Sequence, residues 1–250
     1  PSSPGRIETA AAPESKETPL PASDAALRSA LAAVPKANRP VHVVVHGEGV
    51  SAGWPPSYTY TVTTHLYFAN GYMTRCADWD PGLLSPTPES LGRAYPECGL
   101  ARWRNTGASV QVQSDDGTWT AVDVTDGSVR RFRPAERLDV TFGNVGGAGF
   151  GGPGAATNVA TVFGSDLRMT RRGDIAAGEW STTVLSGADV GGGSARQSQP
   201  LVGQYHLDGH LIAIQRPDGT ITRGFIAGVN EDGALRHVYL NGKHFWNRSE

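Results

Sequence analysis

The sequence predicts an all-β fold, a duplicated antiparallel meander preceded by one short N-terminal helix. Apolar and polar residues alternate with a period of two over most of the chain, and dipeptides ending in Gly separate these runs. One segment centred on such a turn occurs twice. The composition agrees, since 32 Gly and 17 Pro among 250 residues disfavour a helical bundle or a coiled coil.

The first segment, residues 1–22, is rich in Pro, Ala, Ser, Glu and Thr and has almost no bulky apolar side chain. Such a segment buries too little surface to offset its ordering entropy, so we expect a disordered tether. The chain does not begin with Met. A cleaved signal peptide followed by a spacer, a lipoprotein tether and an arbitrary boundary all fit this beginning, and the first two indicate an exported protein.

A short helix is predicted over residues 23–36. A Ser-Asp pair at its beginning can cap the N-terminus, and strong helix formers follow. Leu27 and Leu31 are four positions apart and therefore share one face of this helix. Pro35 ends it.

Two β repeats are predicted to follow, over residues 37–135 and 136–250. Each consists of short strands joined by tight turns, because the turn dipeptides supply the positive φ that a hairpin needs. These dipeptides are Asn70-Gly71, Asp116-Gly117, Asp126-Gly127, Asp208-Gly209, Asp218-Gly219, Asp232-Gly233 and Asn241-Gly242. No helical pattern lies between the strands, so we expect antiparallel pairing. Two small barrels and one continuous barrel or sandwich both fit this pattern.

The duplication is the most specific feature of the sequence. Residues 107–120 align without gaps with residues 209–222, at an offset of 102, and six of the fourteen positions are identical. At the same offset Trp103 matches Tyr205. Further upstream, alternating strands match at an offset of 97. Two copies of one β unit explain these matches.

Cys76 and Cys98 are the only cysteines of the chain. The segment between them is rich in Pro, Gly and Ser and offers no strand or helix to hold its ends together. A disulfide would close this loop and stabilise the fold by about 3 kcal/mol. Neither cysteine belongs to a C-x-x-C pair or to a cluster with metal-ligand spacing. We predict the disulfide, with two free buried thiols as the alternative.

Much of the chain resembles a group of uncharacterised bacterial exported proteins. The shared motifs are Gly203-x-Tyr205-x-x-x-Gly209, Asp218-Gly219, Leu240-Asn241-Gly242, Leu66-Tyr67-Phe68-Ala69-Asn70-Gly71 and Cys98-Gly99. The resemblance covers about residues 60–247. It implies a duplicated lipocalin-like β-meander and an envelope or extracellular setting, and it implies no catalytic residues.

No catalytic residue is predicted. Gly49, Ser51 and Gly53 match the G-x-S-x-G nucleophile elbow, which requires a helix directly after the serine. A Trp-Pro-Pro tripeptide follows instead, so no helix can begin there. Acidic clusters fall mostly in Asp-Gly turns, where the carboxylate bonds the turn backbone. The sequence therefore favours a protein without catalytic activity, with a hydrolase of glycans or esters as the alternative.

No metal site is predicted. If the chain did bind a metal, three histidines would be the weak candidates for its ligands. His206 and His210 flank Asp208-Gly209, where a hairpin can bring their imidazoles together. A zinc ion would need a further ligand, such as His237 from a neighbouring strand. We expect solvated turn residues instead, and no cofactor.

Four tryptophans are predicted as candidates for ligand binding: Trp54, Trp79, Trp119 and Trp180. Aromatic rings on a β surface can stack on sugars or line the mouth of a barrel. Trp54 and Trp79 lie in segments rich in Pro and Gly, with no core evident nearby. Core packing is the alternative for each of them.

These observations favour a non-catalytic binding module that is periplasmic, cell-surface or secreted. Its partner would be a small apolar or glycan ligand or an envelope protein. A structural or adhesive subunit that assembles through strand edges is a further alternative. The formal net charge of −2 gives no reason to expect nucleic acid. No apolar run approaches the roughly 20 residues that would cross a bilayer, so no transmembrane segment is predicted.

Overall fold

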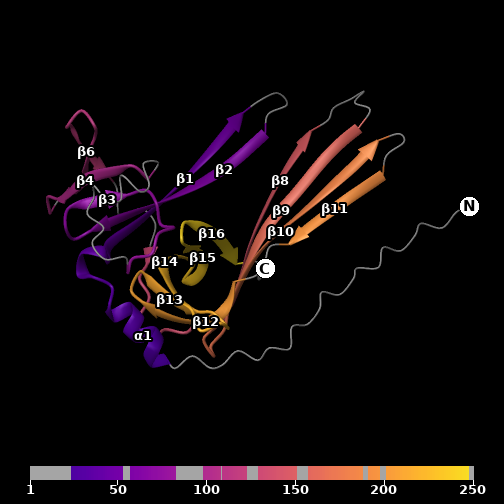
Figure 1. Ribbon diagram of the computed structural model, residues 1–250. Helices are drawn as coiled ribbons and strands as arrows, with labels where there is room; N and C mark the ends of the chain where they lie inside the picture. Colours follow the sequence, from indigo (N-terminus) through magenta and orange to yellow (C-terminus); the bar gives the residue numbers. More distant parts are fainter. Residues whose placement is uncertain are drawn as a thin grey trace, which may run out of the picture.

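The computed structural model describes residues 24–52, 57–82, 98–107, 109–122, 129–150, 157–187, 191–197 and 201–247. Within these residues the chain forms one α-helix, one 3-10 helix and sixteen strands in two antiparallel sheets (Figure 1). The all-β prediction with one short helix near the N-terminus is confirmed. The elements are α1 (Asp24–Ala32), η1 (Lys36–Asn38), β1 (Pro40–Ala52), β2 (Ser57–Phe68), β3 (Tyr72–Thr74), β4 (Leu100–Asn105), β5 (Val110–Gln113), β6 (Trp119–Val122), β7 (Val129–Arg130), β8 (Val140–Phe150), β9 (Thr157–Met169), β10 (Asp174–Gly187), β11 (Gly191–Gln197), β12 (Leu201–Asp208), β13 (Leu211–Gln215), β14 (Ile221–Glu231), β15 (Ala234–Leu240) and β16 (Lys243–Asn247).

Eight of the described strands form a closed antiparallel barrel. Their order is β10, β12, β13, β14, β15, β16, β8 and β9, and β9 pairs with β10 to complete the circle. All eight belong to the second copy of the β unit. One copy is therefore sufficient to close a barrel.

The interior of the barrel is filled by alternate residues of its strands. Phe142, Leu167 and Tyr205 are completely buried there. The other members of this core are Phe132, Leu138, Met169, Ile175, Leu207, Ile212, Ile214, Ile226, Val238, Leu240 and Phe245. Each side chain of this size stabilises the fold by roughly 1.5–3 kcal/mol when it is buried. The period of two in the sequence thus separates an inner from an outer face.

The first copy forms a curled sheet with the order β1-β2-β3-β4-β5-β6. This half-barrel and α1 pack on the outer face of the barrel, over β13, β14 and β15 (Figure 1). Leu27 and Leu31 of α1 are both buried in this contact, as their spacing predicts. The apolar residues of the interface are Leu27, Leu31, Val34, Val43, Leu66, Phe68, Ala77 and Trp79 on one side, and Leu211, Ala213, Phe225, Ala227 and Tyr239 on the barrel.

Two ion pairs fix the position of the half-barrel on the barrel. Arg223 on β14 holds Asp80 in a two-pronged contact, with N···O distances of 2.9 Å and 3.0 Å. Arg39 Nη1 lies 2.8 Å from Asp208 Oδ2. Paired guanidinium and carboxylate groups of this kind add geometric specificity to the apolar contact.

The duplication is visible in the hydrogen bonds that hold equivalent strands. Trp103 Nε1 donates to Phe68 O at 2.8 Å. At the same offset of 102, Tyr205 Oη donates to Thr170 O at 3.1 Å. The indole of Trp103 and the phenol of Tyr205 therefore donate to the backbone oxygen at equivalent positions of the two copies.

The turns repeat in the same way. Asp116 Oδ1 accepts a hydrogen bond from Thr118 N at 2.9 Å, and Asp218 Oδ1 accepts one from Thr220 N at 2.8 Å. Asp-Gly turns require this local bond from the aspartate to the backbone. The acidic clusters of the sequence are thus used here for turn geometry.

The two copies differ in their final strands. By the offsets of the alignment, β1 to β6 correspond to β8, β9, β10, β12, β13 and β14. The second copy continues with β15 and β16, and β16 returns to β8. The first copy continues into β7, which pairs with β14 of the barrel. The chain after β6 therefore connects the two copies, whereas the equivalent chain after β14 closes the barrel.

Four strands extend beyond the barrel at one end. The backbone pairing of β9 with β10 runs without interruption from Met169 and Ile175 at the barrel to Thr157 and Gly187 at the far end (Figure 1). Over this length β10 exchanges its partner β12 for β11. The extension of β8, β9, β10 and β11 borders one side of the barrel mouth.

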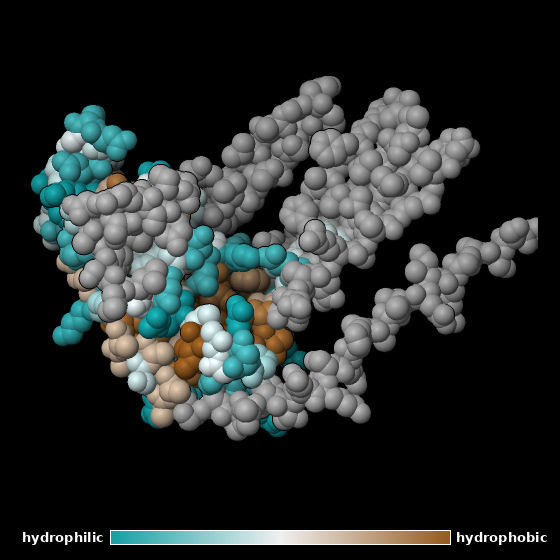
Figure 2. Space-filling model, in the orientation of Figure 1, coloured by the Kyte–Doolittle hydropathy of each residue, from teal (hydrophilic) through white to brown (hydrophobic). Residues whose placement is uncertain are grey.

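Polar and apolar residues gather in different places on the surface of the described residues. Figure 2 shows polar residues over the lobe of β4 and β6, and apolar residues gathered near the barrel. In the part of the chain that the structure describes, no helix has the length and apolarity needed to cross a membrane.

Candidate functional site

A pocket of about 360 Å³ lies at the mouth of the barrel. Its lining residues are Ser165 on β9, Ala177, Gly178 and Glu179 on β10, Leu201 on β12, Leu240 and Asn241 at the end of β15, and Lys243 and Phe245 on β16. Leu240 and Phe245 belong to both the pocket and the core, so the pocket begins where core packing ends. Its volume falls within the range of small-molecule sites, which starts near 300 Å³.

Strand alternation produces this lining. On β10, Ile175 lies in the core, Ala177 lines the pocket and Glu179 lies at its rim, each two residues further along. On β16, Phe245 lies in the core and Lys243 at the rim. Because side chains at every second position share a face, each strand changes from apolar to charged as it leaves the barrel.

An ion pair spans the rim of the pocket. Lys243 Nζ contacts Glu179 Oε1, and this contact joins β16 to β10 across the mouth. The two side chains are 62% and 54% exposed. An ion pair this exposed adds little to stability, so another charged group can replace either member at small cost.

Asn241 is held in one orientation beside this ion pair. Its Oδ1 accepts a hydrogen bond from Phe225 N at 2.9 Å, and its own N–H donates to Phe225 O at 2.9 Å. Gly224 makes room for this side chain, since a Cβ there would lie 2.1 Å from Asn241 Oδ1. Asn241 is one of the lining residues, and because this bond uses its amide oxygen, the N–H donors of Nδ2 are not part of it.

None of the predicted tryptophan candidates is among the described residues that line this pocket. Trp54 lies outside the described residues. Trp180 is in the extension of β10, beyond the pocket, where its backbone pairs with β11. Trp119 is on β6, and the Arg104 guanidinium carbon lies 4.2 Å from its ring centroid.

Trp79 is buried in the interface between the two copies. It is 3% exposed, and its ring centroid lies 5.0 Å from that of Phe225 and 5.9 Å from that of Phe68. The core around Trp79 could not be recognised from its neighbours in the sequence, because its neighbours in space come from β2 and β14. The structure assigns it to packing.

The three histidines considered for zinc lie in different surroundings, and His206 and His210 are buried, not solvated as expected. His206 Nδ1 lies 2.9 Å from Asp24 Oδ1 of α1. This hydrogen bond is the main reason why the pKa of Asp24 is lowered. His210 is 6% exposed, and its Nδ1 has no hydrogen-bond partner among the described residues. His237 faces His244. The structure therefore places the three in different surroundings.

A chain of hydrogen-bonded groups on the outer face of the barrel was missed by sequence reasoning. Glu231 Oε1 lies 3.0 Å from His237 Nε2, and His237 Nδ1 lies 2.9 Å from His244 Nε2. The His244 ring stacks on Tyr239, with centroids 4.7 Å apart. The Asn-Gly turn between β15 and β16 already implies that the two histidines are cross-strand neighbours, so this pair could have been found.

The geometry of this pair is that of a hydrogen bond. The ring centroids of His237 and His244 are 5.1 Å apart, so the two nitrogens lie between the rings and point at each other. Their lone pairs do not converge on a common ion, as two ligands of one zinc would.

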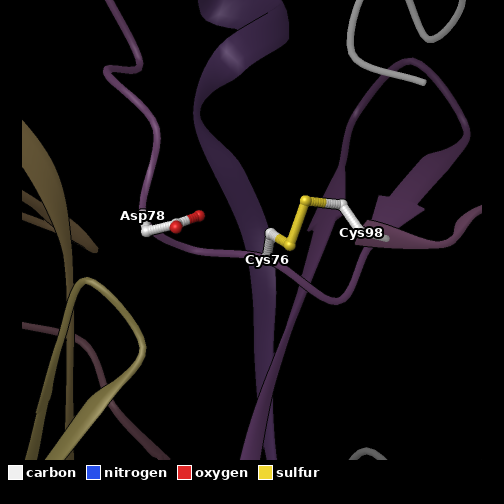
Figure 3. A group of neighbouring side chains, drawn as sticks. All are labelled: Cys76, Asp78 and Cys98. Carbon is white, nitrogen blue, oxygen red and sulfur yellow. A yellow bond between two sulfur atoms is a disulfide. The ribbon is translucent and has the colours of Figure 1, made fainter. Parts of the chain in front are cut away.

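The predicted disulfide between Cys76 and Cys98 is confirmed, with a Cα–Cα distance of 5.0 Å. Figure 3 shows the carboxylate of Asp78 beside it. Within the described residues, these three form the one group whose His, Cys, Asp or Glu ligand atoms lie within 4.8 Å of one another. Because each sulfur is bonded to the other, neither is available as a thiolate, and thiolate is the form that binds metals.

The buried His210 and the half-buried His65 and His244 all have lowered pKa values, and these give the protein a predicted dependence on pH. Burial lowers the pKa of His210 to about 4, and burial together with the neighbouring His46 lowers that of His65 to about 4. The unfolded chain takes up these protons near pH 6.5, the folded chain only near pH 4. Stability is therefore complete above about pH 6.5 and falls as the pH drops towards 4.

We expect His210 alone to lower the free energy of unfolding by about 2–3 kcal/mol between pH 7 and pH 4. Urea unfolding at a series of pH values measures this slope, and His210→Leu should reduce it. An unchanged slope in this variant would show that His210 is not the group responsible.

In comparisons with known proteins, no family model, no curated protein and no solved structure matches the chain.

Proposed function

We propose that this protein is an exported, non-catalytic binding module that holds a small, largely apolar ligand in the mouth of its barrel. The pocket of about 360 Å³ is the observation that carries this proposal. Eight-stranded barrels either fill their interior with side chains or hold one small ligand. The packed core beside an open end combines both arrangements.

The chemistry of the lining supports an amphipathic ligand. Ala177, Leu201, Leu240 and Phe245 supply apolar contact, and the charged groups stand together at the rim. Small-molecule sites typically combine an apolar lining with a few polar groups that fix orientation. A ligand with an apolar body inside and a polar end at the rim fits this division.

The volume sets the size of the ligand. At the roughly 30 Å³ that a water molecule occupies in the liquid, the pocket holds about a dozen non-hydrogen atoms. A ten-carbon alcohol or acid is of this size. Larger lipids would need to extend past the mouth.

Two further features support the proposal. Among the described lining residues, Ser165 is the one with a side-chain hydroxyl, and most of the others are apolar. The disulfide is typical of an oxidising compartment, which agrees with export.

Filling the pocket should abolish binding. We expect Leu201→Trp to weaken the binding of decanol at least tenfold, because an indole would occupy the space that the chain of the ligand needs. Isothermal titration calorimetry of both proteins measures this difference, and thermal unfolding checks that the variant is folded.

The neighbouring residue offers a matched control. Val202 is on the same strand, is 37% exposed and faces outwards, so Val202→Trp should bind decanol as the unmodified protein does. Equal binding by both variants would place the ligand elsewhere and refute the proposal.

A further inference from the structure

The hydrogen-bonding groups at the rim of the pocket are mainly donors. Lys243 carries three N–H donors, and the Nδ2 group of Asn241 carries two more. The Asn241 oxygen is already used by Phe225 N–H. Glu179 is the one carboxylate among the described lining residues.

The rim ion pair offers a ligand one cation and one anion, and the neighbouring amide breaks this balance. An incoming carboxylate that took the place of Glu179 would meet the N–H donors of Lys243 and those of Asn241, whose oxygen is already bonded. An incoming ammonium group that displaced Lys243 would meet the Glu179 carboxylate, but also the same N–H donors of Asn241.

From this asymmetry we infer that the pocket selects amphipathic anions, with Lys243 as the residue that binds their carboxylate. The inference rests on the proposed function, since it assigns the polar end of the same ligand. The apolar chain enters between Leu201, Leu240 and Phe245, and the carboxylate stays at the rim. In this arrangement Asn241 Nδ2 would donate a second hydrogen bond to the same group, since its amide oxygen is held by Phe225 N–H.

Glu179 acts in this scheme as a competitor of the ligand. While it contacts Lys243, the ammonium group is occupied, and binding must break that contact. Removal of its charge should therefore strengthen the binding of an anion, whereas removal of the lysine charge should weaken it. Removing the charge of Glu179 and removing the charge of Lys243 are therefore expected to change the affinity for an anion in opposite directions.

The test compares three probes of equal chain length, decanoate, decanol and decylammonium, by calorimetry on the full chain at concentrations below their micellisation. We expect the unmodified protein to bind decanoate most tightly. Lys243→Met keeps the apolar stem of the lysine, and it should weaken decanoate about tenfold but change decanol less than twofold. Glu179→Gln should strengthen decanoate about threefold or more.

The outcomes separate this inference from the proposed function. If decanol binds but decylammonium binds more tightly than decanoate, or if Lys243→Met leaves decanoate affinity unchanged, the selection of anions is refuted and the pocket remains. If none of the three probes binds, the proposed function fails, and the inference fails with it.

Discussion

Replacing Trp79 by alanine is expected to lower the free energy of unfolding by about 3–5 kcal/mol. Its indole is 3% exposed and lies between Phe68 of the half-barrel and Phe225 of the barrel. Removing it would leave a cavity that the rigid strands on both sides cannot close. Urea unfolding followed by circular dichroism measures the loss.

A second tryptophan gives the matched control for this prediction. Trp119 on β6 is only partly buried and contacts Arg104 on its ring face. Trp119→Ala should cost about 1 kcal/mol or less, because only a solvent-accessible cation–π contact is lost. Similar losses for the two variants would contradict the assignment of Trp79 to the interface core.

Removing the disulfide should have an effect of nearly the same size. Cys76 and Cys98 are separated by 22 positions, and releasing a loop of this length costs about 3 kcal/mol by the chain-entropy estimate. A Cys76→Ala, Cys98→Ala double variant should unfold at lower urea concentration by the corresponding amount. Reductant should destabilise the unmodified protein to the same extent and leave the double variant unchanged.

The disulfide and Trp79 should also be coupled. Trp79 follows Cys76 by three positions, so the covalent bond holds the segment whose indole fills the interface. Combining both changes should therefore cost less than the sum of the separate losses. Strict additivity would indicate that the segment stays in place without the disulfide.

Local rules were sufficient to predict the strands, the turns and the disulfide. The alternation of residues along β12 predicts which side chains are internal, and the Asp-Gly turns adopt their positive φ at Gly117 and Gly219 as expected. The duplication was visible because equivalent residues, such as Trp103 and Tyr205, make equivalent hydrogen bonds.

The unequal closure of the two copies could not be predicted from the alignment. Six strands of the first copy have equivalents in the second, and closure depends on the chain that follows the last of them. After β14, a tight turn at Gly233 sends the chain back as β15. In the first copy, β7 pairs instead with the barrel. The difference depends on contacts between distant parts of the chain, which a repeat pattern does not contain.

The pocket was hidden from sequence reasoning for a similar reason. Its lining comes from β9, β10, β12, the end of β15 and β16, and no segment contributes more than three residues. Sequence reasoning gave preference to tryptophans for their ring chemistry, but the pocket is lined by smaller apolar residues and one phenylalanine. Lys243 could not be recognised as a pocket residue, since a lysine after an Asn-Gly turn is ordinarily a solvated residue.

Nuclear magnetic resonance titration can show whether the ligand binds at the barrel mouth. Adding decanoate to the isotopically labelled protein should shift the amide signals of Ala177, Leu201, Leu240 and Lys243, while those of the half-barrel strands β4 to β6 stay in place. Shifts confined to the half-barrel, or no shifts at saturating decanoate, would contradict a ligand site at the barrel mouth.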